Sequence, residues 1–181
     1  MKQMKQMIAG GKVVLREKRL QDAWNDYAWK KDPELARLDA TIPLDLPFPM
    51  YLRSYAEELS HGDARARVYA IETLDGTHIG NCSYYNLDWD KREAELGILI
   101  GEMAYWNSGF GTDAVAALVH HAFRKEGLKR MYLHTLVVNV RAQKCFQKCG
   151  FVSCGRLTRS GHDFIVMEIK DQEADSRRDS T

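Results

Sequence analysis

Two glycines one residue apart, Gly109 and Gly111, lie between an apolar strand end and an amphipathic helix within residues 98–126. The first N–H groups of a helix have no partner inside it and carry the positive end of the helix dipole, so they can hold an anion. Glycines just before that start let the main chain approach a phosphate without a Cβ in the way. The Thr112 hydroxyl adds a further donor. The spacing therefore predicts a pyrophosphate-binding loop that follows a strand.

The loop does not match the two common phosphate motifs. A Walker loop has Lys and then Ser or Thr straight after its last glycine, whereas Thr112 and Asp113 follow Gly111. A dinucleotide fingerprint has a third glycine and lies in the first strand–helix unit of its domain, whereas this loop lies past the middle of the chain. An ordinary strand-to-helix turn remains the alternative, and the loop alone does not identify the ligand.

The four cysteines, Cys82, Cys145, Cys149 and Cys154, do not form a metal-binding pattern. Three of them are close in sequence, but their spacing fits none of the usual zinc-ligand patterns. Cys145 and Cys149 lie four residues apart on an apolar helix face, where cysteine behaves as a small hydrophobic residue. We expect reduced, mostly structural thiols in a cytoplasmic protein, and no metal.

Length and composition narrow the class of protein. The 181 residues suffice for one well-packed domain. With 26 Lys and Arg against 25 Asp and Glu, the net charge of +1 gives no field for nucleic acid or an anionic membrane. No apolar run approaches the roughly 20 residues of a membrane span, and the N-terminus lacks the apolar segment of a signal peptide. We expect neither a nucleic-acid nor a membrane partner.

The elements that must position the glycine loop follow from periodicity. The helix after the loop has one apolar face, formed by Val115, Leu118, Val119, Ala122 and Phe123. The rest of the chain gives the order β-α-α-β-β-β-α-β-α-β-β. The other expected elements are strands at 13–16, 68–74, 78–87, 93–100, 131–137, 151–158 and 163–169, and helices at 20–29, 51–61 and 140–149.

This pattern predicts an α/β (α+β) fold in one domain over residues 11–170. Its mixed, mostly antiparallel sheet would have about seven strands, flanked by about four helices. Three prolines in residues 41–50 block helix and sheet, so we expect a loop that packs over the domain. Residues 1–10 are expected to form a mobile tail, and the charged residues 171–181 a disordered one.

The order of elements, with the glycine loop after the fourth strand, resembles the GNAT acyltransferase superfamily over nearly the whole ordered chain. The loop of that family reads Arg/Gln-x-x-Gly-x-Gly/Ala, and residues 106–111 read WNSGFG. A second family motif, Asn-x-x-Ala followed by Gly-Phe, appears as NVRA at 139–142 and GF at 150–151. Tryptophan at the first loop position and the segments VVLRE, LQDA and AELGI are similar to the branch of ribosomal-protein alanine and spermidine acetyltransferases.

The resemblance implies acetyl-CoA as the acyl donor. Backbone N–H groups of residues 107–112 would hold its pyrophosphate, and residues 98–100 would pair with the pantetheine arm as another strand does. Asn139 would hydrogen-bond that arm, with a plain helix cap as the alternative or additional role. The residues expected to bind the cofactor on this basis are Ile98, Leu99, Ile100, Trp106, Asn107, Ser108, Gly109, Phe110, Gly111, Thr112, Asn139, Ala142, Cys145 and Phe146.

The same resemblance points to a catalytic base. Acyl transfer from a thioester to an amine needs a neutral amine, so a carboxylate near the splayed end of the 93–100 strand is the natural base. Glu95 is the candidate because the family often has a glutamate in this strand, and a solvated sheet residue is the alternative. Glu93 and His134 are reserves. A backbone N–H near Leu99 would meet the oxyanion.

One position departs from the family. Many members have a tyrosine where this chain has Phe146, and that tyrosine protonates the leaving thiolate. Phe146 has no proton to give. A thiol with an ordinary pKa near ~8.5 is a tolerable leaving group at neutral pH, so the loss can be minor. Cys145, Tyr84 and Tyr85 are possible substitutes.

Two functions therefore stand. The first is an acetyl-CoA-dependent N-acetyltransferase that modifies a primary amine, either a protein N-terminal α-amine or a small amine. The second is a catalytically degenerate acyl-CoA-binding module that acts as a sensor or interaction protein. By analogy, the 41–50 loop, the helix after it and the Tyr84–Tyr85 strand form the acceptor pocket, whose acid-poor lining argues against a polyamine. The oligomeric state stays open, with a homodimer among the options.

Overall fold

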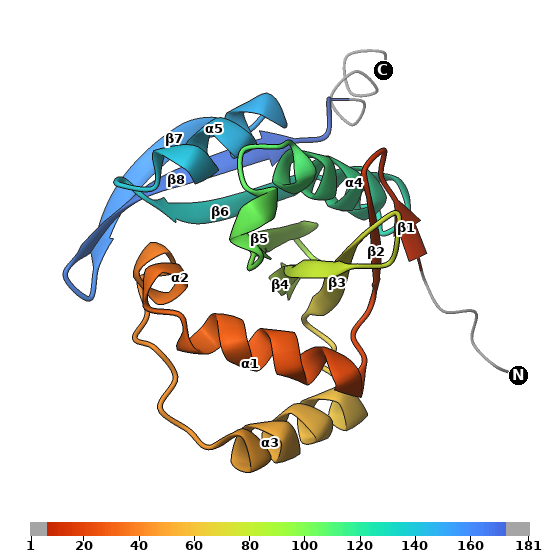
Figure 1. Cartoon of the computed structure of the whole chain (residues 1–181). Coiled ribbons are helices and arrows are strands. Elements are labelled where there is room, and N and C mark those ends of the chain that lie inside the picture. Colours follow the sequence, from red (N-terminus) through yellow and green to blue (C-terminus); the bar gives the residue numbers. More distant parts are fainter. Residues whose placement is uncertain (1–6, 173–181) are drawn as a thin grey trace, which may run out of the picture.

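A mixed sheet of eight strands forms the centre of the molecule (Figure 1). The computed structural model describes residues 7–172. Its strands are β1 (Met7–Ala9), β2 (Val13–Glu17), β3 (Arg67–Thr73), β4 (His78–Asp88), β5 (Glu93–Ile100), β6 (Arg130–Leu136), β7 (Val152–Arg159) and β8 (His162–Lys170). Their order is β1-β2-β3-β4-β5-β6-β8-β7, and only β5 and β6 run parallel within the described chain. The predicted fold class is confirmed, with one strand more than expected.

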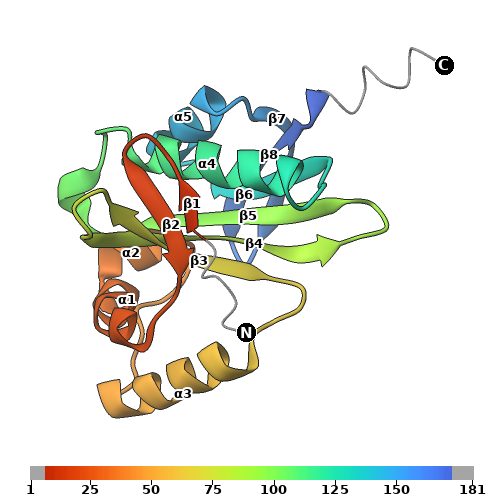
Figure 2. The ribbon, with the colours of Figure 1, turned by 90° about the vertical axis from the view of Figure 1, so that its right-hand side faces the viewer.

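Helices cover both faces of this sheet. They are α1 (Ala23–Lys31), α2 (Pro33–Leu38), α3 (Phe48–His61), α4 (Phe110–Arg124) and α5 (Val140–Lys148), with 3-10 turns η1 (Leu20–Asp22) and η2 (Met103–Tyr105). Helices α4 and α5 lie on one side of the sheet, and α1, α2 and α3 lie on the other (Figure 1 and Figure 2).

The main core lies between the sheet and α4. The predicted apolar face of this helix is confirmed, because Val115, Leu118, Val119 and Ala122 are buried and Phe123 is partly buried against them. Burial of side chains of this size contributes about 1.5–3 kcal/mol each, so this face holds α4, and with it the glycine loop, in place. A second, smaller cluster joins α1 to α3.

The one parallel pair is short. Strand β5 pairs with β6 only from Glu93 to Glu95. Beyond Glu95, β5 continues along β4 as far as Ile100, while β6 continues along β8 to Leu136. The two strands therefore diverge, and the edge of β5 that faces β6 is left without a strand partner. This splayed gap positions the site described below.

The prediction of a tail over residues 1–10 is wrong for residues 7–9, which form β1 against β2. The Asp113 carboxylate accepts hydrogen bonds from the backbone N–H groups of Gly11, Lys12 and Val13, at 3.0, 2.7 and 3.0 Å. These bonds fix the β1–β2 turn to the start of α4. Residues 1–6, and residues 173–181 of the predicted C-terminal tail, lie outside the described part of the chain.

Helix α2 and the start of α3 also differ from the prediction. Asp32 caps α2 through its side chain, and Pro33 occupies its first position. Helix α3 begins at Phe48 rather than after residue 50, with Pro47 before it and Pro49 in its first turn. Proline is tolerated there because the first N–H groups of a helix have no partner inside it. The prolines therefore start this helix instead of blocking it.

A buried ion pair ties β2 to the helical side of the molecule. Arg16 donates from Nη1 and Nη2 to the two carboxylate oxygens of Asp22 at 2.7 and 2.8 Å, and from Nε to Glu72 at 2.5 Å. The Arg16 and Asp22 side chains are only 4% and 3% exposed. Burial would raise the pKa of Asp22, but the hydrogen bonds from Arg16 and from the Arg19 backbone N–H outweigh it and lower the pKa below its ordinary value.

Candidate active site

The loop between β5 and α4 has the backbone shape expected of its glycines. Gly109 precedes α4 in the left-handed conformation, with φ of 85°, and Asn107 is also left-handed, with φ of 58°. No side chain within residues 7–172 caps the start of α4. The first N–H groups of this helix are therefore available to a ligand, as anion binding requires.

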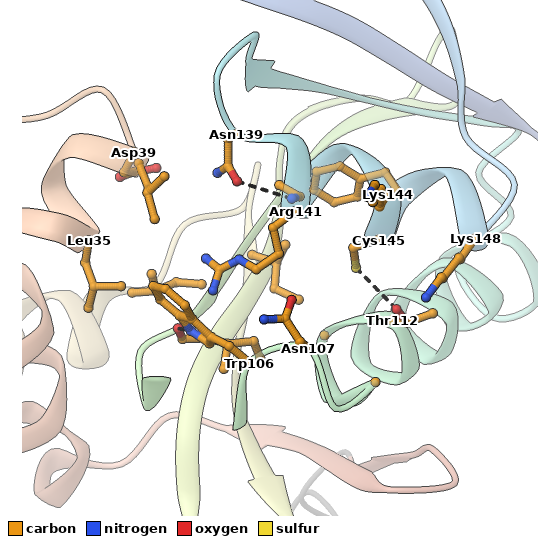
Figure 3. A pocket seen from close by; sticks show the side chains of 18 residues that line it. Leu35, Asp39, Trp106, Asn107, Thr112, Asn139, Arg141, Lys144, Cys145 and Lys148 are labelled. Carbon is orange, nitrogen blue, oxygen red and sulfur yellow. Dashed lines mark hydrogen bonds between the residues drawn. The ribbon is translucent and has the colours of Figure 1, made fainter. Parts of the chain in front are cut away.

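A cavity of about 310 Å³ opens between this loop, the free edge of β5 and helix α5 (Figure 3). Twelve of the fourteen residues predicted to bind the cofactor line it: Ile98, Leu99, Ile100, Trp106, Asn107, Gly109, Gly111, Thr112, Asn139, Ala142, Cys145 and Phe146. The others that line it are Leu35, Leu38, Asp39, Arg141, Lys144 and Lys148. Segments that are distant in sequence thus meet around one space.

Ser108 and Phe110 are the two predicted residues whose side chains lie outside this lining. The Ser108 hydroxyl donates to the Trp106 carbonyl at 3.2 Å, and its own carbonyl accepts from Lys12 Nζ at 3.0 Å. The Phe110 ring packs edge-on against Tyr105, with centroids 5.0 Å apart. Both side chains support the loop, and only their backbone N–H groups remain candidates for phosphate binding.

Helix α5 forms the opposite wall. The Asn139 side chain accepts a hydrogen bond from the Ala142 N–H at 3.2 Å, so its role as a helix cap is confirmed, while its contact with pantetheine stays a prediction. The Thr112 hydroxyl donates to Cys145 Sγ at 3.6 Å across the wall (Figure 3). Phe146 is 5% exposed and packs on Phe151.

Arg141 is a site residue that the sequence analysis missed. Its guanidinium carbon lies 3.2 Å from the centroid of the Trp106 ring, so the side chain crosses the cavity from α5 to the loop (Figure 3). Its Nη1 is buried without a hydrogen-bond partner in the described chain, and this burial lowers the pKa of Arg141. The sequence does contain a hint of this role. Arg141 lies in the first turn of α5, where a positive charge is unfavourable beside the positive end of the helix dipole, so a function other than helix stability is expected for it.

Glu95 occupies the point where β5 and β6 separate. Its Oε1 accepts from His134 Nδ1 at 2.6 Å, and its Oε2 accepts from the Asn86 side chain at 2.9 Å. Glu95 is 8% exposed, so the alternative of a solvated sheet residue is wrong. It does not line the cavity, but it lies three residues from Ile98, about 10 Å along the strand.

Two tyrosines flank this carboxylate. Tyr85 on β4 and Tyr132 on β6 lie opposite Glu95 in the sheet register. Burial, and then the nearby charge of Glu95, raise the pKa of both hydroxyls, so they stay protonated at neutral pH. Glu95 thus lies between two aromatic side chains whose hydroxyls are neutral.

The reserve candidates fall into other roles. Glu93 accepts a hydrogen bond from Arg130 Nη1 at 2.7 Å and forms an ion pair, so it is a structural group and not a free base. His134 is the partner of Glu95. Tyr84 is completely buried in the main core, so it is not a substitute for the missing tyrosine at Phe146.

Residues 7–172 contain no group of three or more His, Cys, Asp or Glu side chains that could hold a metal ion. Within this range, each helix is too short or too polar to cross a membrane.

Comparison with known proteins decides the family. Residues 12–152 match the acetyltransferase (GNAT) domain, which is most of the chain. The chain belongs to the GNAT acetyltransferase family. Membership of the GNAT family, which the two sequence motifs predict, is therefore confirmed. The chain is thus an acetyltransferase of this family.

Individual members of the family share only low sequence identity with this chain. The spermidine N(1)-acetyltransferase of Vibrio cholerae is 28% identical over 97 residues, which are 54% of this chain and 55% of that protein. This chain thus matches about half the length of that curated relative. A crystal structure of spermidine N-acetyltransferase from Vibrio cholerae in complex with CoA and spermine has a TM-score of 0.78 at 22% identity, covering 88% of this chain and 95% of that one.

A second solved GNAT structure is RimJ of Mycobacterium smegmatis in complex with CoA-disulfide. Its TM-score is 0.72 at 21% identity, and the match covers 93% of this chain and 89% of that chain. At such identities the likeness concerns the fold. The neighbours come from the branch that the sequence motifs resemble, and neither neighbour supports the alternative of a degenerate binding module.

Proposed function

We propose that this GNAT enzyme transfers the acetyl group of acetyl-CoA to a primary amine, by direct attack of the amine on the thioester. The observation that carries the proposal is the 2.6 Å hydrogen bond between the buried Glu95 and the partly buried His134, at the start of the gap between β5 and β6. A base must lie within reach of the amine proton, and this carboxylate lies on β5 three residues before Ile98 in the cavity wall.

The cavity offers groups that fit acetyl-CoA. The start of α4 has N–H donors without a side-chain cap, which suit a pyrophosphate. Arg141 has a buried N–H that lacks a partner in the described chain, which suits an anion. The edge of β5 at residues 98–100 has no strand neighbour on the β6 side, which suits the amide groups of pantetheine. Among these groups, the buried Arg141 nitrogen is the one whose lack of a partner carries a free-energy cost that a bound anion would remove.

The reaction takes place at the thioester carbonyl of acetyl-CoA, and the chain makes three contributions to it. Glu95 would accept a proton from the amine, and His134 and Asn86 would hold the carboxylate in place while it does so. A backbone N–H near Leu99 would stabilise the oxyanion. The CoA thiolate would leave and take a proton from water, since Phe146 cannot supply one.

The acceptor is proposed to be a protein N-terminal α-amine or a small amine. The Tyr85 and Tyr132 rings beside Glu95 favour an acceptor with an apolar or planar group next to its amine. Spermidine, named for the Vibrio cholerae relative, is a small amine and belongs in the same test.

The proposal is tested by measuring CoA release with a thiol reagent that reports free CoA. The panel contains acetyl-CoA with peptides that differ in their first residue, and with spermidine and simple monoamines. We expect turnover with at least one class, and a matched Glu95→Gln enzyme should be strongly impaired on the same acceptor. Tight CoA binding without turnover on any amine would favour the degenerate module instead.

A further inference from the structure

Two thiols and one threonine meet where α5 packs on the first turn of α4. Cys145 Sγ accepts from the Thr112 hydroxyl at 3.6 Å, and Cys149 Sγ donates to the Thr112 carbonyl at 3.4 Å. Both thiols thus contact the same residue, Thr112, from successive turns of the α5 segment. Cys145 lines the cavity, and Figure 3 shows its sulfur directed at Thr112. Cys145 therefore forms part of the cavity wall, and Cys149 lies beside it against the first turn of α4, at the proposed phosphate loop.

The surroundings of Cys145 favour its thiolate. The pKa of Cys145 is lowered to about 7, chiefly through its interaction with the neighbouring Cys149 thiol; burial opposes this, and Thr112, Lys148 and Arg141 assist. The interaction with Cys145, together with burial, raises the pKa of Cys149, which keeps its proton. A thiolate is the nucleophilic form of cysteine, so the pair contains one activated and one protonated sulfur at neutral pH.

The end of α5 can bring the two sulfurs into bonding distance. Residues four apart on a helix have Cβ atoms about 5–6 Å apart, whereas a disulfide needs about 3.5–4.5 Å. Cys149 directly follows the last residue of α5, and its N–H is already shared between the carbonyls of Cys145 and Phe146, at 3.3 and 3.0 Å. This final turn is thus partly tightened, and a further shift of about 1–2 Å closes the gap.

We propose that Cys145 and Cys149 form a reversible dithiol–disulfide site that controls access of acetyl-CoA to its cavity. With hydrogen peroxide as the oxidant, the Cys145 thiolate attacks one peroxide oxygen, the O–O bond breaks, and a sulfenic acid and hydroxide result. The Cys149 thiol then attacks the sulfenic sulfur, the S–S bond forms and water leaves.

The effect of the disulfide on CoA binding follows from the contacts that the two sulfurs make in the reduced protein. Formation of the S–S bond draws both sulfurs away from Thr112 and tightens the turn that carries Phe146, another residue of the cavity wall. The inference rests on the proposed use of this cavity by acetyl-CoA. It predicts that the oxidised protein binds CoA at least tenfold more weakly, and that bound CoA slows the oxidation of Cys145.

The test uses the full chain with Cys154→Ser, because Cys154 is exposed on β7 and shares a tryptic peptide with Cys149. Trypsin cleaves after Lys144 and Lys148, so the disulfide joins peptide 145–148 to peptide 149–156. After graded peroxide, mass spectrometry should find this linked pair, and calorimetry should show the loss of CoA affinity. A reducing agent should restore the affinity.

Cys149→Ser in the same background is the matched variant. Serine still donates to the Thr112 carbonyl but cannot resolve a sulfenic acid, so the linked pair should be absent. A second equivalent of peroxide should then carry Cys145 to the sulfinic acid, and the loss of affinity at that stage should resist reduction. Absence of the linked pair in the parent, or its presence with unchanged CoA affinity, would overturn the inference. A reduced parent that fails to bind CoA would overturn the proposed function instead, and the peptide would still decide whether the disulfide forms.

Discussion

A 2.6 Å hydrogen bond joins Glu95, at the last paired position of β5 and β6, to His134, which lies two residues beyond the register partner of Glu95, Tyr132. The two side chains come from adjacent parallel strands that share only three paired positions. The divergence that opens the free edge of β5 therefore begins at the proposed base. A single irregularity in the sheet places the reacting groups next to the space for the cofactor.

Glu95→Gln should lower kcat/KM by about ten- to a thousandfold at pH 7, because the amide cannot accept the amine proton. At that pH an α-amine, with a pKa near ~7.8, is roughly a tenth neutral, whereas a lysine-like amine near ~10.4 is almost wholly charged. The loss should therefore shrink as the pH rises past the pKa of the acceptor. The pH profile of CoA release from pH 6.5 to 9.5 measures both effects. An undiminished loss at pH 9 with an α-amine would mean that Glu95 is more than a base.

His134 is expected to position Glu95 without carrying the proton itself. His134→Ala should lower kcat about tenfold or more with little change in KM for acetyl-CoA, because the carboxylate loses one of its two hydrogen-bond donors. His134→Asn is the matched variant, since its amide can donate near the position of Nδ1. Steady-state kinetics should show partial recovery with asparagine. Equal loss in both variants would instead assign proton transfer to the imidazole.

Gly111 tests the phosphate loop. A Cβ at this position would lie 3.5 Å from Ile100 and 3.7 Å from Cys145, which are ordinary contacts, so Gly111→Ala should fold and bind CoA within a few-fold. Gly111→Asp adds a negative charge where the pyrophosphate is proposed to bind, and should weaken CoA binding severely. Titration calorimetry of both variants, with circular dichroism as the folding control, decides the question. Equal CoA affinity in the two would place the anion elsewhere.

Phe146→Tyr restores the hydroxyl that many family members have at this position. Maximal turnover should stay within a few-fold, because departure of a thiolate with an ordinary pKa near ~8.5 does not limit acyl transfer at neutral pH. Phe146 is buried against Phe151, so the folding transition of the variant is measured alongside the rate. A large gain in kcat would show that the missing acid is limiting.

Asp22→Asn should destabilise the fold by about 3 kcal/mol at pH 7, because it leaves the buried Arg16 with Glu72 as its one remaining carboxylate partner in the described chain. The folded pKa of Asp22 lies below its ordinary value, so its contribution is present above pH ~3.9 and is lost as the pH falls below that. The difference between wild type and variant should therefore narrow in acid. Urea unfolding at several pH values measures it, with Glu34→Gln of the exposed Glu34–Arg37 pair as a control that should leave stability almost unchanged at each pH.

The sequence predicts the features that depend on local order. The glycine loop and the apolar face of α4 follow from spacing alone, and the choice of Glu95 follows from strand alternation together with the family motif. What completes the site comes from far along the chain. His134 lies 39 residues from Glu95, and its pairing depends on the short parallel register that no local pattern reveals. The stacking of Arg141 on Trp106 likewise needs α5 and the loop to face each other.

The bond between Asp113 and the β1–β2 turn has a consequence for the charge around α4. Asp113 lies in the first turn of this helix, beside the place proposed for a phosphate, where an unshielded carboxylate would repel the ligand. Three backbone N–H groups from residues 11–13 surround its oxygens and disperse that charge. The opening hairpin of the chain thus acts as a shield, and a protein shortened past residue 13 would expose a repulsive anion at its own cofactor entrance.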